Sequence, residues 1–395
     1  MLDDAEFQRI AAGAAQRAAM LQLLFHDLFC GPQRVLGEVL DAELVARVID
    51  VHGWRGDDLR AYWAGADVDT VRFIYGPDLI RNASGEWLVL EDNIGCLGGV
   101  GNARWVLDQY LVATNLTLAP GVSMRDDLRV AVEAFLACAE VTNRPDEVVC
   151  LAGQAPRSAP NADSSEEARK RATLAAVGLA TTSIEQRLVD GGSRPAAVIN
   201  LGGTLGGSFR DLLTTWDADG GLPILNGPGI GLVANKAFLA FSDDLIRFYL
   251  GDEPIMSPPP TRQLDGRSPA RRAVVKRTDG CEGSDVFFVD GSRRSDRAFV
   301  GELATRWGVG GGIVQAFVEP SRLPVGGPDS WCWYRVELRP ITYVVGAARI
   351  LVGEVPVGRA TLNLGDRRAN LVRDACALAV VREPGCGDSV VKAST

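Results

Sequence analysis

A candidate β-hairpin in the first quarter of the chain carries oxygen-bearing side chains that could bind a metal ion. The segments VRFIYGPDLIR and EWLVLEDN are typical of strands, and residues 82–85 between them have the composition of a turn. A four-residue loop there pairs Asp78 with Val89. Because side chains alternate between the two faces of a strand, Asp78, Glu91 and Asn93 then share one face. Two carboxylates and an amide suit Mg²⁺ while leaving positions open for phosphate oxygens.

The same residues also fit a simpler structure. Glu91, Asp92 and Asn93 could form an ordinary polar end of an exposed strand. The metal hypothesis depends on the register, because a slip of one residue would divide the three oxygen donors between two faces. Both interpretations remain open on this motif alone.

Lys276 ends a second candidate strand, AVVK, and is followed by the loop RTDGCEG, which contains Gly280 and Gly283. A lysine at a strand end, next to flexible backbone with free N–H groups, is a reasonable phosphate-binding arrangement. A lysine that extends from a strand end into solvent fits the sequence as well. A P-loop sequence, GxxxxGK[ST], is absent.

Arginines on late strands are candidates for binding a phosphate or a carboxylate. Arg339 in VELRP and Arg359 in VGRATLN can each donate two parallel hydrogen bonds to such a group. Arg81, at the end of the first hairpin strand, completes the candidate catalytic set. Arg335 is expected to be an ordinary surface arginine.

Composition excludes several kinds of site. The eight cysteines form no CxxC pair, and the only histidines are His26 and His52, so a zinc knuckle, a multi-histidine metal site and a histidine-based triad are disfavoured. The net charge of -9 argues against a nucleic-acid-binding surface. There is no signal-peptide pattern and no apolar run long enough to cross a bilayer. We therefore expect a protein of the reducing cytoplasm that binds neither nucleic acid nor membrane.

The elements that must position these residues alternate between helices and strands. Apolar spacing predicts helices over the following ranges: 5–29, 42–63, 102–114, 126–140, 184–189 and 232–250. Further helices are expected in EEARKRATLAAVGL, SFRDLLTTW and SDRAFVGELATRW, and further strands in VFFVD, IVQAFVEP and WCWYRVELRPITYVVGAARILVG. Between residues 145 and 225 the strands VVCLA and AAVINL alternate with helical segments, which is typical of a parallel α/β layer.

Taken in order, these segments resemble the circularly permuted ATP-grasp proteins, whose best-understood relatives are the glutathionylspermidine synthases. The likeness is carried by AAQRAAMLQLLFHDLF, by GPDLIRNASGEWLVLEDN, by LPILNGPGIGLVANKAFLAFSDDLIRFYLGDEPIMSPPPT, and by the run from AVVKRTDGCEGSDVFF to VELRPITYV. The second of these is close to the family pattern of G-x-D-L-x-R, a turn and L-E-D-N. Together the segments cover well over half of the chain, whereas residues 145–220 match only loosely.

The resemblance implies a mixed α/β (α+β) fold of the ATP-grasp type with permuted element order. In such a fold an antiparallel sheet forms the nucleotide site, beside a parallel α/β layer. It also implies a division of the chain. Residues 1–140 would hold the N-terminal helical segment and the metal-binding hairpin of the permuted catalytic core, residues 141–230 an α/β domain, residues 231–385 the nucleotide-binding region, and residues 386–395 a tail.

The resemblance also implies roles for individual residues. The magnesium ligands of the family fall on Asp78, Glu91 and Asn93. The positions that it uses against nucleotide phosphates and adenine fall on Lys236, Lys276, Gly280, Gly283, Gln315 and Val318. Arg339 matches the arginine of the family's D-L-R-P pattern, in which Glu337 replaces the aspartate. Of the 41 basic residues four are lysines, and two of those occupy the expected positions.

The implied activity is an ATP- and magnesium-dependent ligation of a carboxylate to an amine, by way of an acylphosphate, with ADP and phosphate as products. The alternatives are a nucleotide-binding scaffold without chemistry, a ligase that loads the carboxylate onto a thiol, and, ranked last, a small-molecule kinase. The substrates would be a small carboxylate and an amine, or a peptide or carrier protein. The chain departs from the family after Asn93, where Cys96-Leu97-Gly98-Gly99 replaces P-S-G, and at GRATLNLGDRRAN, which replaces an ending with K-D-T-W. Both changes lie where a substrate could bind.

Overall fold

The computed structural model describes most of the chain. The described residues are 2–95, 97–117, 126–141, 147–152, 166–182, 186, 194–201, 221–280, 285–308, 310–327, 330–346, 349–354, 356–361, 375–378, 380 and 392–393. The predicted helix SFRDLLTTW, Gly283 and almost all of the predicted helix at 184–189 lie outside these residues.

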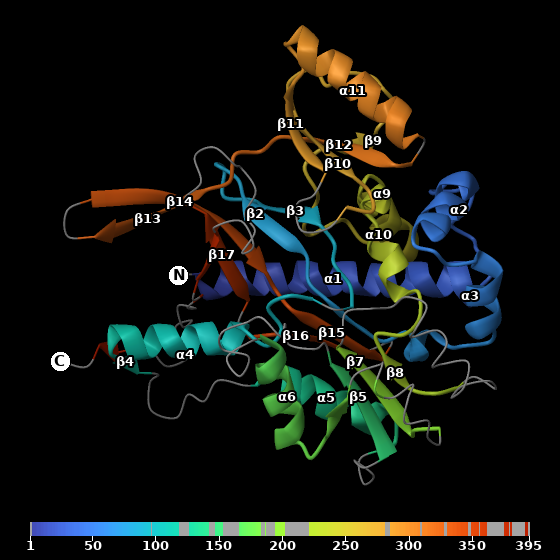
Figure 1. The fold of residues 1–395 in the computed structure, drawn as a ribbon, viewed down its shortest axis with the longest axis vertical. Coiled ribbons are helices and arrows are strands. Elements are labelled where there is room, and N and C mark those ends of the chain that lie inside the picture. Colours follow the sequence, from blue (N-terminus) through green and yellow to red (C-terminus); the bar gives the residue numbers. More distant parts are fainter. Residues whose placement is uncertain are drawn as a thin grey trace.

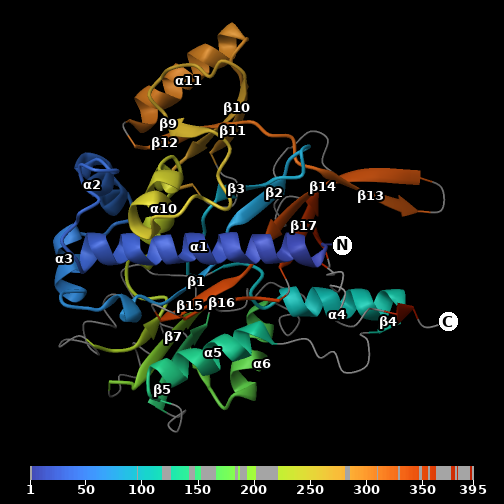
Figure 2. The ribbon, with the colours of Figure 1, turned by 180° about the vertical axis from the view of Figure 1, so that it is seen from behind.

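A long helix, α1 (Asp4–Phe29), runs across the middle of the molecule in both views (Figures 1 and 2). Asp3 caps its first turn, because the carboxylate accepts a hydrogen bond from the amide of Glu6 at 2.6 Å. Ile10, Leu24 and Phe25 of α1 are completely buried, and the helix is the centre of the main hydrophobic core. The predicted helix at 5–29 is therefore confirmed.

Two predicted helices are broken into shorter pieces. The stretch 42–63 forms α2 (Ala42–Val51) and α3 (Gly56–Tyr62). The predicted helix at 232–250 is wrong as a single element, because it forms the 3-10 turn η4 (Ile230–Ala234), α9 (Lys236–Leu239) and α10 (Ser242–Leu250). Asn235 causes the first of these breaks: its backbone is extended (φ -58°, ψ 134°), and its side chain caps α9 by accepting from the amide of Ala237.

The central antiparallel sheet joins segments from both ends of the chain. Its strands run in the order β18 (Ala375–Leu378), β17 (Val357–Thr361), β14 (Ser330–Arg339), β2 (Asp78–Arg81), β3 (Trp87–Glu91), and β13 (Arg322–Gly327) pairs with the outer part of β14. In Figure 1 the β13–β14 hairpin extends away from the body. Because β14 lies between β2 and β17, it brings late arginines next to the early hairpin.

The register of the β2–β3 hairpin differs from the predicted one. Val89 pairs with Leu79 rather than with Asp78, so the loop is one residue longer than expected. A bulge then inserts Leu90, and Asp78 pairs directly with Glu91. The two carboxylates still share a face, but as direct cross-strand partners instead of diagonal neighbours.

A second antiparallel sheet forms the lobe at the top of Figure 1, where α11 (Arg294–Trp307) covers one of its faces. Its strands run in the order β11 (Val286–Asp290), β10 (Arg272–Arg277), β12 (Gly312–Ala316), β9 (Thr261–Gln263). The predicted strands AVVK and VFFVD are confirmed as β10 and β11. The strand predicted from IVQAFVEP ends at Ala316, and therefore Val318 follows the strand instead of lying in it.

The predicted parallel layer is confirmed at the bottom of Figure 1. The strands β6 (Thr181–Thr182), β5 (Val148–Ala152), β7 (Ala197–Leu201) and β8 (Ile224–Leu225) pair in that order, all in parallel. The helices α5 (Asp127–Cys138) and α6 (Glu166–Ala176) share a core with this layer. The same core includes Ile341 and Tyr343, so the layer packs on the C-terminal strands. The predicted domain boundaries at 140, 230 and 385 stay predictions.

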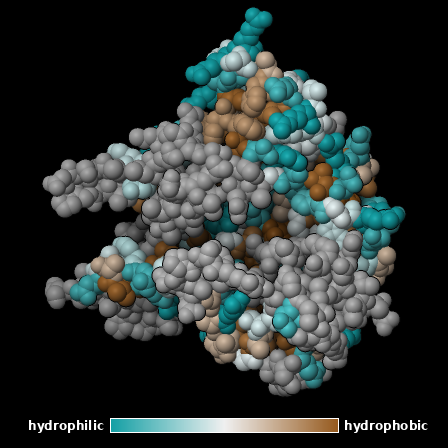
Figure 3. All heavy atoms as spheres, viewed as in Figure 1, coloured by the Kyte–Doolittle hydropathy of each residue, from teal (hydrophilic) through white to brown (hydrophobic). Residues whose placement is uncertain are grey.

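The remaining elements connect these layers. They are η1 (Val68–Thr70), β1 (Phe73–Tyr75), α4 (Ala103–Thr114), β4 (Leu116–Thr117), β15 (Thr342–Gly346), β16 (Arg349–Val352) and β19 (Lys392–Ala393). Strands β1, β15 and β16 form a small antiparallel sheet. Among the described helices, none is long and apolar enough to cross a membrane. On the face shown in Figure 3, the apolar residues of the described chain lie in small patches separated by hydrophilic ones.

Candidate functional site

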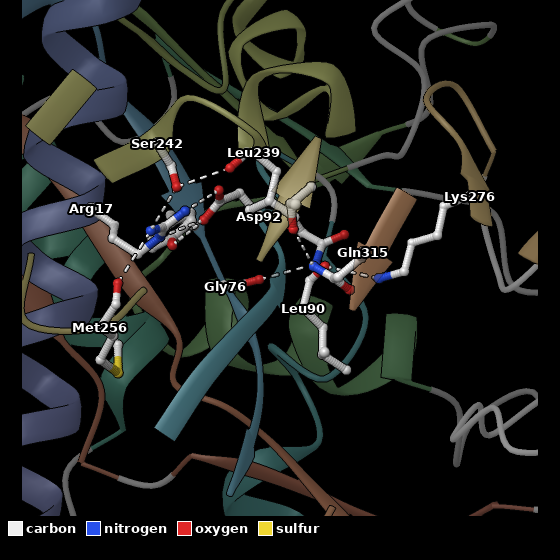
Figure 4. A network of polar contacts seen from close by, with 12 residues as sticks. Arg17, Gly76, Leu90, Asp92, Leu239, Ser242, Met256, Lys276 and Gln315 are labelled. Carbon is white, nitrogen blue, oxygen red and sulfur yellow. Dashed lines mark hydrogen bonds and ion pairs between the residues drawn. The ribbon is translucent and has the colours of Figure 1, made fainter. Parts of the chain in front are cut away.

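Two lysines from different elements meet at the end of the β2–β3 hairpin. Lys236, at the start of α9, lies with Nζ 3.4 Å from a carboxylate oxygen of Glu91 and donates a hydrogen bond to the carbonyl of Gly280 at 2.6 Å. Lys276, on β10, donates to the carbonyl of Leu90 at 2.9 Å, as Figure 4 shows. The bulge at Leu90 is therefore held by a lysine from the upper lobe. The structure thus brings together both predicted phosphate-binding lysines, Gly280 and Glu91.

Asp78 is bound by two arginines, Arg339 of the adjacent strand β14 and Arg359 of β17, the next strand beyond it. Arg339 donates from Nε to Oδ1 at 2.8 Å and from Nη2 to Oδ2 at 2.9 Å, and Arg359 Nη2 lies 2.5 Å from Oδ1. Burial raises the pKa of Asp78, but the guanidinium groups of Arg339 and Arg359 outweigh burial and hold the pKa well below its usual range. Asp78 is consequently an ionised anchor for both predicted catalytic arginines.

Glu337 is a third carboxylate in this group, on β14 directly opposite Arg359. Its Oε2 lies 3.2 Å from Arg359 Nη2, and its side chain is 13% exposed. Burial raises the pKa of Glu337 to about 7; Arg359 opposes the shift, and the carboxylates of Asp78 and Glu91 add to it. A glutamate at this position is therefore partly protonated near neutral pH.

The cluster has more positive than negative charge. Among the described residues it contains four basic side chains, Lys236, Lys276, Arg339 and Arg359, and the three carboxylates of Asp78, Glu91 and Glu337. Burial and the neighbouring Lys236 lower the pKa of Lys276, although the three carboxylates oppose this. In the described part of the chain, Arg359 Nε is buried without a hydrogen-bond partner. A buried site with surplus positive charge and an unused donor is suited to a polyanion.

The donor set at the hairpin end fits a magnesium ion that is shared with phosphate oxygens. Asn93, two residues after Glu91, uses its Nδ2 to donate to the carbonyl of Gly76 at 3.2 Å, which leaves Oδ1 as an acceptor. Asp78 fits less well as arranged here, because two guanidinium groups neutralise its charge. No group of three or more His, Cys, Asp or Glu side chains suited to a metal occurs among the described residues. One carboxylate and one amide agree with Mg²⁺ that takes its other ligands from substrate and water.

Arg81 is not brought to the cluster. Its side chain is 46% exposed and forms an ion pair with Glu6 of α1 at 3.2 Å. Since neighbouring residues of a strand point to opposite faces, Arg81 lies on the other side of β2 from Ile80 and belongs to the face that meets α1. The structure therefore gives Arg81 a place outside the candidate catalytic set.

The predicted adenine-contacting residues lie on the upper lobe. Gln315 is buried on β12, and its Nε2 donates to Oγ1 of Thr261 at 3.2 Å. Val318 follows the end of this strand, and Gly283 lies outside the described residues. The adenine role of Gln315 and Val318 stays a prediction.

Sequence reasoning missed a buried ion pair directly behind the site. Arg17 of α1 is completely buried and donates to both carboxylate oxygens of Asp92, from Nε at 3.0 Å and from Nη2 at 2.7 Å. The hydroxyl of Tyr75 also donates to Asp92, at 2.6 Å (Figure 4 shows the Arg17–Asp92 pair). Two signals for this pair were present in the sequence: an arginine at the same helical spacing as the apolar residues Ile10, Ala14, Leu21 and Leu24, and an aspartate between two candidate metal ligands.

Comparison with known proteins agrees with this geometry. Residues 1–152 match the family model described as circularly permuted ATP-grasp type 2. The resemblance to the circularly permuted ATP-grasp proteins is confirmed. The matched part contains α1, the β2–β3 hairpin and α5, while the two lysines and the late arginines of the cluster lie beyond it.

Two curated relatives of this chain are named as ligases. A protein of Frankia casuarinae that provisionally bears the name glutamate–cysteine ligase 2-2 is 26% identical over 321 residues, which covers 71% of this chain and 34% of the relative. A protein of Frankia alni, provisionally named glutamate–cysteine ligase 2-3, is 25% identical over 305 residues, which covers 70% of this chain and 34% of the relative. The chain thus spans about a third of the length of these relatives.

A solved structure shows the same fold. A glutathione synthetase-like effector from Globodera pallida, in its apo form, superimposes with a TM-score of 0.57 at 12% sequence identity, over 91% of this chain and 86% of that one. The predicted fold class, a mixed α/β architecture with antiparallel sheets and a parallel layer, is confirmed.

Proposed function

We propose that this chain is an ATP- and magnesium-dependent ligase that activates a carboxylate as an acylphosphate and joins it to an amine. The observation that carries the proposal is the surplus of basic over acidic side chains around Glu91, of which Lys276 is buried and the other three basic ones are partly buried. Withdrawing four basic side chains from most of their contact with water costs free energy unless anions balance them, and the three carboxylates do so only in part. A triphosphate supplies the missing negative charge. The ligase names of the curated relatives support the same class of reaction.

In this proposal the two lysines of the cluster bind the nucleotide. Lys236 and Lys276 would neutralise the phosphate oxygens, with the backbone near Gly280 beside them. Glu91 and Asn93 would hold Mg²⁺, which supplies further neutralisation of the phosphate charge. Positioning and charge neutralisation are the main needs of phosphoryl transfer.

Asp78 and the arginines would act on the transferring group. Asp78 fixes Arg339 and Arg359 on one side of the cluster, so that their remaining N–H groups are oriented before substrate arrives. The substrate carboxylate attacks the γ-phosphorus, the bond to the β-phosphate oxygen breaks, and ADP leaves. The amine then attacks the acyl carbon, phosphate departs, and the amine releases a proton. In both steps the guanidinium groups would stabilise the developing negative charge.

The names of the relatives suggest which substrates to test first. The names of both Frankia proteins pair glutamate with cysteine. Glutamate as the carboxylate and cysteine as the amine are therefore the first pair to test. The chain covers only about a third of those proteins, and it departs from the wider family after Asn93 and after Arg359. A screen of other amino acids, amines and thiols therefore belongs in the same experiment.

The test is phosphate and ADP release by the purified chain with ATP, magnesium chloride, L-glutamate and L-cysteine, followed by other pairs. Hydroxylamine added without an amine should trap an acylphosphate as a hydroxamate. Lys276→Met should lower both signals by about a hundredfold or more. Lys170→Met is the matched control, because Lys170 is also a buried lysine with carboxylate partners but lies on α6. ATP binding without phosphate release for any pair would favour a scaffold, and a stable phosphorylated product would favour a kinase.

A further inference from the structure

Arg17 occupies the back of the candidate site, on the opposite side of the chain from Lys236. Asp92 follows Glu91 directly, and consecutive side chains of an extended segment point in opposite directions. Glu91 accordingly meets Lys236, while Asp92 meets the guanidinium of Arg17. The orientation of Glu91 therefore depends on how firmly Asp92 is held behind it. A bidentate pair with a completely buried arginine is a rigid attachment.

The same guanidinium also contacts the segment that carries Lys236. Arg17 Nη1 lies 3.4 Å from Oγ of Ser242, the first residue of α10, as Figure 4 shows. That hydroxyl donates in turn to the carbonyl of Leu239, the last residue of α9, at 3.1 Å. Because α9 is a single turn that begins at Lys236, its last residue moves together with its first. One arginine thus contacts the segments that hold both Glu91 and Lys236.

A third attachment fixes the segment between α10 and β9, which lies behind the hairpin. Arg17 Nη1 donates to the carbonyl of Met256 at 3.3 Å, and the next carbonyl, of Ser257, accepts from the amide of Val89 on β3 at 3.1 Å. One helical residue before Arg17, Gln16 donates to the carbonyl of Glu253 and accepts from the amide of residue 255, both at 2.9 Å. The segment around Met256 is therefore fastened to α1 on one side and to β3 on the other.

We infer that Arg17 is a positioning residue, whose guanidinium fixes the separation between Glu91 and Lys236 through Asp92, Ser242 and Met256. Glu91 would hold the metal and Lys236 the phosphates, so this inference rests on the proposed function. Lysine could replace the charge of Arg17 but not the planar set of donors that reaches three partners at once. Fold stability alone does not require the ion pair, because well-packed apolar residues of similar volume can replace a buried pair without loss of stability.

The experiment compares Arg17→Met/Asp92→Leu and Arg17→Lys with the wild-type chain. The double variant removes both charges together, which avoids an unpaired buried charge. Leu24→Ala is the control, because Leu24 is completely buried in the same helix but is not part of this network. Thermal unfolding reports the stability of each variant. Calorimetric titration with ATP, once in magnesium chloride and once in EDTA, gives the factor by which magnesium improves ATP affinity.

We expect the magnesium factor to fall about tenfold or more in the double variant and in Arg17→Lys, as for groups that orient metal ligands without touching the metal. Leu24→Ala should unfold at a lower temperature and keep its magnesium factor. An unchanged magnesium factor in a folded double variant would overturn this inference and leave the proposed function standing. An equal fall of the magnesium factor in Leu24→Ala would do the same. If the double variant does not fold, Arg17→Lys decides by the same criterion. A wild-type chain that does not bind ATP would overturn the proposed function and this inference together.

Discussion

Two groups of buried charge lie back to back at the β2–β3 hairpin, and they differ in their balance. Behind the hairpin, Arg17 and Asp92 form a pair of one cation and one anion, completed by the neutral hydroxyl of Tyr75. In front of it, the described cations around Glu91 outnumber the carboxylates. A balanced buried pair is complete within the protein itself. A surplus of one sign costs stability and is eased when a ligand of opposite charge binds.

The largest expected effect is on catalysis, and it should follow from changes in the cluster around Glu91. Lys276→Met and Glu91→Gln should each lower ADP formation by about a hundredfold or more, because each removes a preorganised charge from a site shielded from water. The measurement is the rate of ADP formation at saturating ATP with the substrate pair that the screen identifies. Lys170→Met should keep the wild-type rate. Near-normal rates in both Lys276→Met and Glu91→Gln would mean that the charges around Glu91 have no catalytic role that the Arg17–Asp92 pair lacks.

The next effect concerns stability, which should depend more on the Arg17–Asp92 pair than on the cluster around Glu91. Asp92→Asn leaves Arg17 as an uncompensated buried charge and should lower the free energy of unfolding by about 3–5 kcal/mol. Lys276→Met should cost about 1 kcal/mol or less, since it loses one hydrogen bond but relieves the repulsion from Lys236. Urea denaturation of both variants measures the difference. Equal losses of unfolding free energy in the two variants would mean that the charges around Glu91 are balanced within the protein as well as those of the Arg17–Asp92 pair.

Much of this arrangement follows from sequence, and the exceptions have identifiable causes. The helix α1 and the strands β2, β3, β10 and β11 were predicted because apolar periodicity and turn residues mark them locally. The register of β2–β3 was not. No glycine signals the bulge at Leu90, and the lysine that binds its carbonyl is 186 positions away. The breaks near Asn235 and Ser242 likewise depend on side-chain bonds to the local backbone, which a helical pattern conceals.

The candidate site was predictable in its residue types more than in its contacts. Resemblance pointed to Lys236 and Lys276, and the structure brings both to Glu91. The pairing of Asp78 with Arg339 joins positions 261 residues apart, so no local pattern could reveal that the carboxylate is already occupied. Arg81 was assigned from its place in a motif, but strand alternation directs it to Glu6 instead.

A smaller effect should appear in the pH dependence of stability. Glu337 has a pKa of about 7 in the folded chain against a usual value of 4.5, so folding favours its protonated form. The stability that this provides is complete below about pH 4.5 and is lost as the pH rises to about 7, and it amounts to at most about 3 kcal/mol. Asp78 acts in the opposite sense, because its lowered pKa provides stability that disappears only as the pH falls well below 4.

Urea denaturation of the wild type and of Glu337→Gln between about pH 5 and pH 7.5 separates these contributions. The wild-type chain should lose stability across this window, and the variant, which cannot ionise at residue 337, should lose much less. Variants of the balanced pair behind the hairpin should keep the wild-type slope. If Glu337→Gln retains the full slope, another group titrates in the window and the charge balance of the cluster is different from the one described.

The smallest effect is expected at Arg81. This residue tests whether the face of β2 that meets α1 takes part in the reaction. Its ion pair with Glu6 is half exposed, and surface pairs of this kind contribute about 0–1 kcal/mol. Arg81→Gln should therefore change the unfolding free energy by less than about 1 kcal/mol. Because Arg81 faces α1 rather than the cations around Glu91, the rate of ADP formation should stay at the wild-type value. A large loss of rate with unchanged stability would return Arg81 to the catalytic set and show that the two faces act on the same substrate.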